Sequence, residues 1–349
     1  MDFQAEYRSK LRTPAEAVRA VKNGDWVDYT SGLGFPPLLD AALAARRDEL
    51  HDVKVRGNLC AGPVQIVECD PEQAHFLYHT WHCSAYERKL CDRGLCYFTP
   101  MIFRNLAWYY REFLTVNVAM ASVAPMDRHG YFSLALNGSY IDAMLDKTKR
   151  IFLEVNDRQP RGLCGSLIHI SQVDAIVEYN HDLPVLPPVQ LDEVSKTIGG
   201  LIAERIPDGA CLQLGIGAIP DATGMALKSK HDLGIHTEMF TDSMVELIEC
   251  GAVNNSKKQI HRGKTVTTFA FGSQRIYDYI DDNPAVEILP VEYVNDPDVI
   301  CQNDNMISIN AAVEVDLFGQ VCAESVGTKH MSGSCLLYTS PSPRDYAAS

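Results

Sequence analysis

Residues 210–220 read Ala-Cys-Leu-Gln-Leu-Gly-Ile-Gly-Ala-Ile-Pro, a short apolar run followed by a glycine turn. A run of this length is typical of a strand that is covered on both faces, as strands in parallel sheets are. The glycines permit a tight turn, and the proline at residue 220 is suited to the first turn of a helix. The stretch therefore predicts a strand, a turn and a helix, the unit from which open α/β sheets are built.

The same order of elements is predicted near the start of the chain. A capping threonine, proline and glutamate at residues 13–16 predict a helix that runs to about Lys22. A short strand follows at residues 26–29, and a glycine turn at 32–37 leads into an apolar helix at 38–45. The first half of the chain thus starts with a helix, a strand, a turn and a helix.

Sliding one segment over the other suggests that the chain contains two related halves. Gly24 aligns with Gly209 and Gly32 with Gly217, since 209 − 24 and 217 − 32 both give 185. Two glycines and a pattern can also coincide by chance, and that alternative stays open. If the halves are related, the sequence predicts two similar open-sheet α/β domains.

A proline-rich segment marks the predicted boundary between these domains. Residues 183–188 read Leu-Pro-Val-Leu-Pro-Pro, and prolines favour an extended, semi-rigid path between compact units. We expect a first domain at residues 1–183, a linker at 184–190 and a second domain at 191–334. Apolar runs at 151–155 and 175–177 are predicted to be buried strands of the first domain.

Composition narrows the class of protein. The chain has 349 residues, of which 46% are hydrophobic, and 45 acidic against 31 basic residues give a net charge of −14. Such a charge argues against binding to a nucleic-acid backbone, which requires a basic face. The first residues lack the pattern of a secretory signal, and no run approaches about 18 apolar residues. We expect a soluble, cytoplasmic protein without nucleic-acid or membrane partners.

The 11 cysteines show no disulfide spacing and are expected to be reduced thiols. Cys91 and Cys96, with His82 and Cys83 nearby, raise the alternative of a zinc site. Zinc sites usually add a second well-spaced pair, so core packing is the preferred interpretation and no metal site is predicted.

The turn at residues 215–219 is a candidate anion site. A strand that ends in glycines before a helix presents free amides and the positive end of the helix dipole to a phosphate or an acyl oxyanion. The alternative is a tight turn that needs glycine only for its backbone angles. The third glycine of a dinucleotide-binding fingerprint is absent, so a nucleotide oxidoreductase is disfavoured.

Glu238 is the candidate nucleophile or base. It lies among apolar neighbours in residues 233–240, which we expect to form one strand, close to its carboxyl end. Open α/β sheets bind ligands at that end, and a carboxylate there can attack a carbonyl carbon. The alternative is an ordinary surface or ion-paired glutamate. The offset of 185 residues places Val53 at the corresponding position of the first half, which predicts one active site per chain.

These motifs carry a resemblance to a known family. Gly-Ile-Gly-Ala-Ile-Pro at 215–220, Gly-Ile-His-Thr-Glu-Met-Phe at 234–240 and Ser-Ile-Asn-Ala-Ala-Val-Glu-Val-Asp-Leu-Phe-Gly-Gln at 308–320 resemble the acetyl-CoA hydrolase/transferase family. The similarity is strongest to its butyryl-CoA:acetate and 4-hydroxybutyrate CoA-transferase branch. Residues 1–3 and 23–29 also resemble that branch, so the resemblance extends to about residue 334. It implies a two-domain CoA-transferase fold whose halves face each other across the active site.

The resemblance also implies roles for individual residues. Glu238 falls on the catalytic glutamate, which forms an acyl-glutamyl anhydride and then a glutamyl-CoA thioester in ping-pong kinetics. Asn295 falls on an oxyanion-hole amide, although an Asn-Asp-Pro turn is an equally ordinary interpretation. Coenzyme A contacts fall on Gly215, Ile216, Gly217, Ala218, Ile219 and Val313. Coenzyme A is then a substrate and not a permanently bound cofactor.

Further expectations concern partners and the acyl site. The resemblance implies an acyl-CoA and a short-chain carboxylate such as acetate as substrates, and a homo-oligomer is possible. Residues 32–37 are expected to face the acyl group. Tyr78, Trp81 and His82 are candidates for lining its pocket, but aromatic residues at such spacing are more often part of a core.

The end of the chain departs from the family. Residues 335–345, Cys-Leu-Leu-Tyr-Thr-Ser-Pro-Ser-Pro-Arg-Asp, resemble the translation of a transposase adapter used in short-read sequencing, and residues 335–349 are interpreted as an adapter-derived tail. Family members continue with a Gly-Gly-Gln segment that supplies a second oxyanion donor. We therefore expect the complete gene product to be a CoA-transferase and the 349-residue polypeptide to be inactive or unstable.

Two other functions remain open. An acyl-CoA hydrolase would use the same glutamate but resolve the intermediate with water. A non-catalytic CoA-binding or assembly protein would need no nucleophile, and the intact Thr-Glu-Met context of Glu238 argues against it.

Overall fold

The computed structural model describes residues 2–134, 136–163, 167–187 and 189–331. Its first half is built on a parallel seven-stranded sheet with the order β4-β3-β2-β1-β5-β7-β9. The strands are β1 (Trp26–Tyr29), β2 (Val53–Arg56), β3 (Phe76–Thr80), β4 (Tyr97–Phe98), β5 (Val118–Val123), β7 (Ile151–Val155) and β9 (Ala175–Glu178). β5 and β7 are buried along their whole length, which is why they read as continuous apolar runs.

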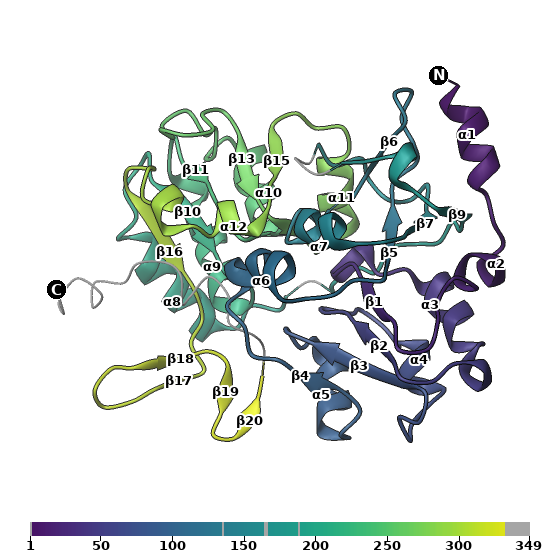
Figure 1. Ribbon diagram of the computed structural model, residues 1–349. Coiled ribbons are helices and arrows are strands. Elements are labelled where there is room, and N and C mark those ends of the chain that lie inside the picture. The colour runs from purple at the N-terminus through teal and green to yellow at the C-terminus, as the bar shows by residue number, and fades with distance from the viewer. Residues whose placement is uncertain (1, 135, 164–166, 188, 332–349) are drawn as a thin grey trace.

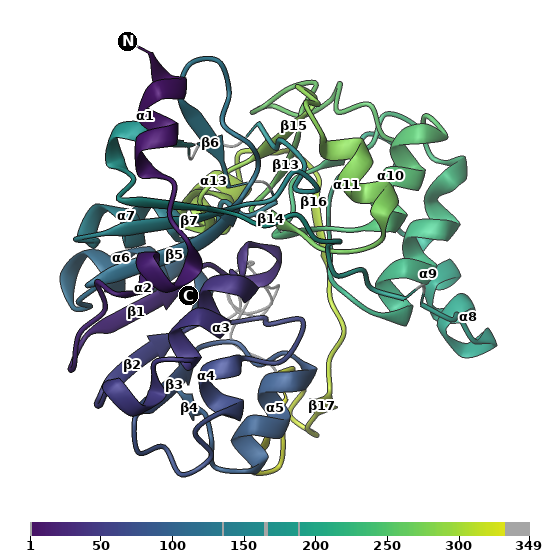
Figure 2. The same ribbon diagram turned by 90° about the vertical axis from the view of Figure 1, so that its right-hand side faces the viewer.

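Helices cover both faces of this sheet (Figures 1 and 2). They are α1 (Phe3–Lys10), α2 (Pro14–Val18), α3 (Pro37–Ala44), α4 (Gln65–Glu68), α5 (Ala85–Asp92), α6 (Leu106–Glu112) and α7 (Ile141–Lys147). The antiparallel pair β6 (Tyr131–Ser133) and β8 (Leu167–His169) lies beside them. The helix that starts after the threonine cap ends at Val18 and not at about Lys22, as the sequence had predicted.

The second half has the same kind of sheet in shorter pieces. β10 (Cys211–Leu214) lies between β11 (Gly234–Ile235) and β16 (Met306–Ile309), all parallel. β13 (Thr265–Thr267) pairs with β15 (Val286–Ile288), and a single bridge from His236 to Val266 joins this pair to the end of β11. β12 (Met239–Phe240) pairs with β14 (Phe269–Ala270).

The remaining elements of the second half surround these strands. The helices are α8 (Glu193–Ala203), α9 (Ala218–Ala226), α10 (Asp242–Glu249), α11 (Gln274–Ile280), α12 (Val291–Val294) and α13 (Pro297–Ile300). Two hairpins, β17 (Glu314–Val315) with β18 (Val321–Cys322) and β19 (Ser325–Val326) with β20 (Lys329–His330), project from the body at the lower left of Figure 1. The predicted tail at 335–349 lies outside the described residues.

The strand order confirms that the halves are alike. The first half runs β4-β3-β2-β1-β5, and the second half runs β15-β13-β11-β10-β16 when the bridge to Val266 is followed. β1 and β10 correspond residue for residue at the offset of 185. The predicted fold class, two similar open-sheet α/β domains, is confirmed.

The predicted counterpart of Glu238 was wrong. Trp26 pairs with Lys54 in the first half, and Cys211 pairs with Gly234 in the second. The spacing between these strands is thus 28 residues in one half and 23 in the other, so the offset falls from 185 to 180 at the second strand. Asn58, and not Val53, corresponds to Glu238.

The strand expected at residues 233–240 is interrupted. The amide of Thr237 still donates to the carbonyl of Val266 in β13, at 2.9 Å. The carbonyl of Glu238 instead accepts the amides of Thr268 and Phe269, at 3.0 and 3.2 Å. The chain therefore changes from one sheet to another at Glu238.

The proline-rich segment packs against the second half. Leu183 is buried, the hydroxyl of Tyr277 donates to the carbonyl of Pro184 at 2.6 Å, and the amide of Leu186 donates to Gly272 at 2.9 Å. The predicted domain boundaries themselves stay a prediction. None of the helices in the described ranges has the length and apolar character needed to cross a membrane.

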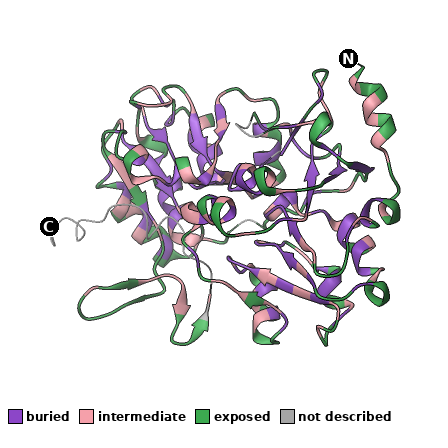
Figure 3. Cartoon of the chain, in the orientation of Figure 1, coloured by how far each residue is buried: buried purple, intermediate pink, exposed green. Residues whose placement is uncertain are grey.

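The two halves are joined by shared backbone pairing. Segment 136–139 of the first half runs beside 268–270 of the second, with bonds from Ala270 to Leu136 at 2.9 Å and from Gly138 to Thr268 at 2.8 Å. Figure 3 shows buried residues continuing through this region. Residues 268–270, which include the two amides that bond to the carbonyl of Glu238, are therefore part of the interface between the halves.

Candidate active site

Glu238 lies at the change of sheet between β11 and β12, and only 8% of the residue is exposed. Its backbone is fixed on one side by the amides of Thr268 and Phe269 and by the hydroxyl of Thr267, at 3.0 Å. The interruption of the strand thus holds one carboxylate at the carboxyl ends of the sheet strands, where open α/β folds place their ligands. Glu238 therefore lies after the carboxyl end of β11, between two strands and not inside the single strand expected from the sequence.

Asn295 touches this carboxylate. Its side-chain amide donates to Oε2 of Glu238 at 2.5 Å, and the residue is completely buried. A carboxylate accepts only, so the contact fixes Nδ2 toward Glu238 and leaves Oδ1, which has no partner among the described residues. Asp296 also caps the following helix at 2.8 Å, so the turn and the contact with Glu238 occur together.

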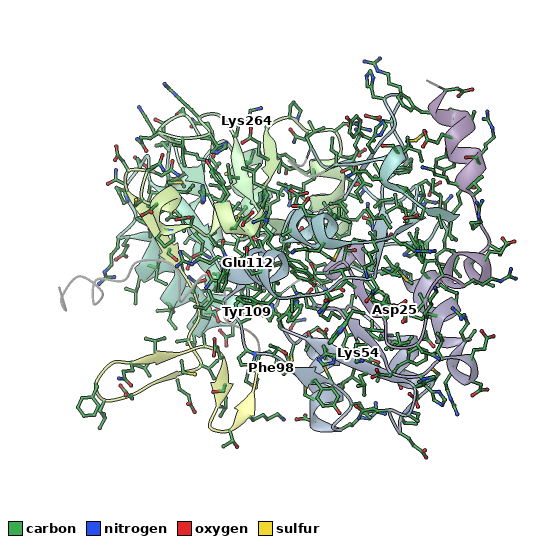
Figure 4. The ribbon with its side chains drawn as sticks, in the orientation of Figure 1. Asp25, Lys54, Phe98, Tyr109, Glu112 and Lys264 are labelled. Atoms are coloured by element: carbon green, nitrogen blue, oxygen red, sulfur yellow. The ribbon has the colours of Figure 1, made fainter. Side chains whose placement is uncertain are left out.

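Asn295 is held by the short helix that precedes it. The amide of Val291 donates to Ser139 of the first half at 2.7 Å. Glu292 receives two bonds from Arg111, at 2.6 and 2.7 Å. Tyr109 and Glu112, labelled in Figure 4, mark the helix α6 that carries Arg111. Contacts from the first half therefore help to position α12, the helix that leads to Asn295.

The predicted anion turn follows β10. Ile216 is exposed, and Gly217 has a φ of +117°, a conformation that favours glycine. A Cβ on Gly215 would lie 2.8 Å from Oδ1 of Asn310. Helix α9 begins at Ala218, two residues before the predicted proline, so the glycines lead directly into its N-terminus.

A cavity of about 400 Å³ extends from this turn to Met239, the residue that follows Glu238 in the chain. Ile216 from the turn, Met239 from the residue after Glu238, and Phe271 all line it. Asp221, whose pKa is raised by burial, contributes polar surface. The volume falls in the range of small-molecule sites.

In the first half, a side chain occupies the N-terminus of the corresponding helix, α3. Oε2 of Glu154, from the end of β7, accepts the amides of Leu38 and Leu39 at the start of α3, at 2.9 and 3.0 Å. Glu154 is fully buried, and burial raises its pKa to about 8. The carboxyl group of Glu154 thus occupies the N-terminus of α3, the end of a helix that favours an anion. At the N-terminus of α9, the neighbouring Ile216 is exposed.

The first-half turn lies near the catalytic segment. Gly32 and Leu33 line a small cavity together with Phe269, whose amide bonds to Glu238. That residues 32–37 face the acyl group stays a prediction. Tyr78 and Trp81 are buried in the cores of the first half, so for both the core interpretation describes the observed packing.

Val313 lies apart from this arrangement. It is 45% exposed and bonds through its amide to Cys322, at 2.8 Å, in the projecting hairpin. Its predicted contact with coenzyme A stays a prediction. Within the described ranges no three His, Cys, Asp or Glu side chains are grouped in a way that could hold a metal ion. Cys83 and Cys91 lie 3.8 Å apart between their sulfurs.

Sequence reasoning missed two residues near Glu238. Nε2 of His236 donates to the carbonyl of Val294 at 2.8 Å. Asn137 donates to the carbonyl and hydroxyl of Ser31, at 2.8 and 2.6 Å, within the first half, and its backbone forms a bridge to Phe269 of the second half. The signal for His236 was available, because residues two apart on a strand share a face.

Comparison with known proteins finds relatives over most of the chain. The acetyl-CoA hydrolase/transferase N-terminal domain matches residues 1–187, and the C-terminal domain of the same family matches residues 272–336. The butyryl-CoA:acetate CoA-transferase of Anaerostipes caccae is 42% identical over 343 residues, covering 96% of this chain and 76% of its own length. The 4-hydroxybutyrate coenzyme A transferase of Clostridium kluyveri is 40% identical, covering 95% and 78%.

The fold is also found in solved structures. The crystal structure of RipA from Yersinia pestis superposes with a TM-score of 0.89 at 38% identity, covering 94% of this chain and 78% of that one. Acetyl-CoA hydrolases among the relatives are less similar, at 21% and 29% identity.

Proposed function

The chain belongs to the acetyl-CoA hydrolase/transferase family, and from this premise we propose that it is an acyl-CoA:carboxylate CoA-transferase. The acyl-CoA is of the butyryl or 4-hydroxybutyryl type, and the acceptor is a short-chain carboxylate such as acetate. The observation that carries the proposal is the buried Glu238 carboxylate with the Asn295 amide 2.5 Å from it.

Glu238 supplies the nucleophile. An oxygen of its carboxylate attacks the thioester carbonyl, the C–S bond breaks, and coenzyme A leaves as a thiolate with an acyl-glutamyl anhydride behind it. The thiolate then attacks the glutamyl carbonyl of the anhydride and releases the first carboxylate. The resulting glutamyl-CoA thioester reacts with the second carboxylate through the same steps in reverse, so covalent catalysis proceeds by a ping-pong sequence.

Asn295 supplies a fixed hydrogen-bond donor. Each attack on a carbonyl in this sequence passes through an oxyanion, and a donor that is already in place needs no reorganisation. In the resting site the amide orients the Glu238 carboxylate. During attack on the glutamyl carbonyl, the same N–H is within reach of the oxygen that becomes negative.

The glycine turn and its cavity suit coenzyme A as a substrate. Gly215, Ile216, Gly217, Ala218 and Ile219 lie at the N-terminus of α9, where amides and the helix dipole favour an anion. The cavity itself carries the carboxyl groups of Asp221, Asp242 and Glu246. These groups disfavour phosphates inside it, so we assign the cavity to the uncharged pantetheine arm. A cytoplasmic location and a homo-oligomer stay predictions.

Hydrolysis is the second candidate function, because water could resolve the same intermediates. The burial of Glu238 and the complete burial of Asn295 favour transfer, since transfer requires that water is kept from the anhydride. Release of free coenzyme A from butyryl-CoA, measured with and without acetate, separates the two. A hydrolase releases it without acetate, and a transferase produces acetyl-CoA instead.

Trapping the covalent intermediate tests the proposal directly. The protein is incubated with butyryl-CoA, quenched and digested, and the peptide that contains Glu238 is examined by mass spectrometry. We expect a mass increase of one coenzyme A less one water, lost on treatment with hydroxylamine and absent in Glu238→Ala. A stoichiometric adduct is detectable even when turnover is slow. An unmodified peptide after long incubation, with butyryl-CoA shown to be bound, would contradict the proposal.

A further inference from the structure

We propose that His236 is a positioning residue for the reaction: its Nε2–H bond to the carbonyl of Val294 places the Asn295 amide on Glu238. The inference rests on the proposed function. His236 and Glu238 belong to one segment, and Val294 and Asn295 to another. Two hydrogen bonds of 2.8 and 2.5 Å, running in opposite directions, join the segments.

His236 donates to the carbonyl of Val294, which has no hydrogen-bond partner within its own helix. Helix α12 is only four residues long and ends at Val294, and the last carbonyls of a helix have no partner within it. His236 is 1% exposed, so water does not compete for the position. Satisfying this carbonyl fixes the residue directly before Asn295.

The imidazole is suited to this role by its tautomer. A carbonyl only accepts, so Nε2 carries the proton and Nδ1 does not. Nδ1 is buried and has no partner among the described residues. Burial lowers the pKa of His236 to about 4, which keeps the ring neutral at physiological pH. A neutral ring adds no charge beside the Glu238 nucleophile.

Other anchors of α12 do not replace His236. Arg111 and Ser139 hold Glu292 and Val291, at the start of the helix. His261 holds the Tyr293 hydroxyl at 2.7 Å on a partly exposed side. Of these side-chain contacts, only that of His236 acts on the peptide unit that joins Val294 to Asn295, whose N–H bonds within the helix to the carbonyl of Val291 at 2.9 Å.

Three variants distinguish the effect of losing the hydrogen bond from the effect of losing the imidazole ring. His236→Leu removes the donor, and His236→Gln keeps a donor at a similar position. His79→Leu is the matched control, because burial lowers the pKa of His79 to about 4 as well, and His79 is partly buried where His236 is fully buried. It lies in the first half between the rings of Trp26 and Tyr97, at 5.1 and 5.3 Å.

The first measurement does not depend on activity. The side-chain amide of Asn295, assigned by comparison with Asn295→Ala, is observed by NMR for chemical shift and hydrogen exchange. We expect wild type, His236→Gln and His79→Leu to share a shifted, slowly exchanging signal. In His236→Leu that signal is expected to move toward the position of a free amide and to exchange faster.

The second measurement is the single-turnover rate of glutamyl-CoA formation. We expect His236→Leu to lower it on the order of 10²-fold, the effect of a misplaced catalytic group, with unchanged butyryl-CoA affinity and recovery in His236→Gln. An unchanged Asn295 signal in His236→Leu would overturn the proposal, and so would equal losses in the Leu and Gln variants. If wild type forms no adduct, the proposed function fails, and the NMR signal still decides the role of His236.

Discussion

Glu154 and Glu238 show how much a buried carboxyl group depends on its partners. Both lie among apolar residues in the sequence, at the ends of predicted strands. Glu154 accepts two backbone amides at the start of α3, whereas Glu238 accepts the side-chain amide of Asn295. The sequence could predict that Glu238 lies at the carboxyl end of a sheet. It could not predict the contact with Asn295, which forms between residues 57 positions apart.

Replacing Glu154 tests whether its buried carboxyl group is protonated in the folded protein. Its pKa is about 8 in the folded protein and about 4.5 when unfolded, so the folded state binds the proton more tightly. Stability from this group is therefore lost as pH rises from about 5 to 8, at up to about 1.4 kcal/mol per pH unit. The folding stability of Glu154→Gln lacks this dependence on pH. Urea unfolding at pH 5.5, 7 and 8.5 is expected to show the variant gaining on wild type as pH rises.

The exposed Glu72 provides the control for this measurement. Glu72→Gln changes the same functional group on the surface, and its difference from wild type is expected to stay constant over the same pH range. A constant difference for Glu154→Gln as well would show that Glu154 is ionised in the folded protein.

At the scale of elements, the strand–turn–helix units were predictable and the interruption at Glu238 was not. β1 and β10 lie where their apolar runs predicted them. Residues 233–240 carry three polar residues, at 236–238, between apolar ones, and this pattern does not distinguish an interrupted strand from a continuous one. The break arises because Thr237 pairs with Val266 while Glu238 pairs with residues 268 and 269. Short helix α12 likewise depends on anchors from other elements.

Gly217→Ala tests the glycine turn. No atom lies within 4 Å of a Cβ at this position, so the change adds no clash, but the φ of +117° is unfavourable for alanine. We expect a cost of about 1–3 kcal/mol or a shift of the turn that weakens coenzyme A binding. Thermal unfolding and calorimetric titration with coenzyme A measure both effects.

Gly200→Ala is the matched control for the turn. Gly200 lies inside α8, also has free space at its Cβ position, and has an ordinary helical conformation. Alanine there is expected to stabilise by up to about 1 kcal/mol and to leave coenzyme A binding unchanged. Equal behaviour of the two variants would show that the conformation of Gly217 is not required.

At the scale of the whole molecule, the sequence predicted two related halves but not how they meet. The offset of 185 residues holds for the first strand of each half and changes to 180 at the second, because the connection is five residues shorter. Loop lengths change freely between related domains, so an ungapped alignment could not place Asn58 opposite Glu238. The pairing of segment 136–139 with 268–270 has no signal in composition or period.

The ion pair between Arg111 and Glu292 offers a test of this interface. It joins α6 of the first half to α12, the helix that leads to Asn295, through two bonds of 2.6 and 2.7 Å. Both side chains are more than a third exposed, so solvent screening limits the pair to about 0.2–1 kcal/mol. A double-mutant cycle with Arg111→Ala and Glu292→Ala, followed by urea unfolding, measures that coupling.

The single variants are also expected to slow glutamyl-CoA formation, because each loosens α12. The pair Glu193–Lys196 within α8 is the control, since its removal changes neither the interface nor the reaction. A zero coupling energy between Arg111 and Glu292, with unchanged rates, would show that the halves hold α12 without this pair.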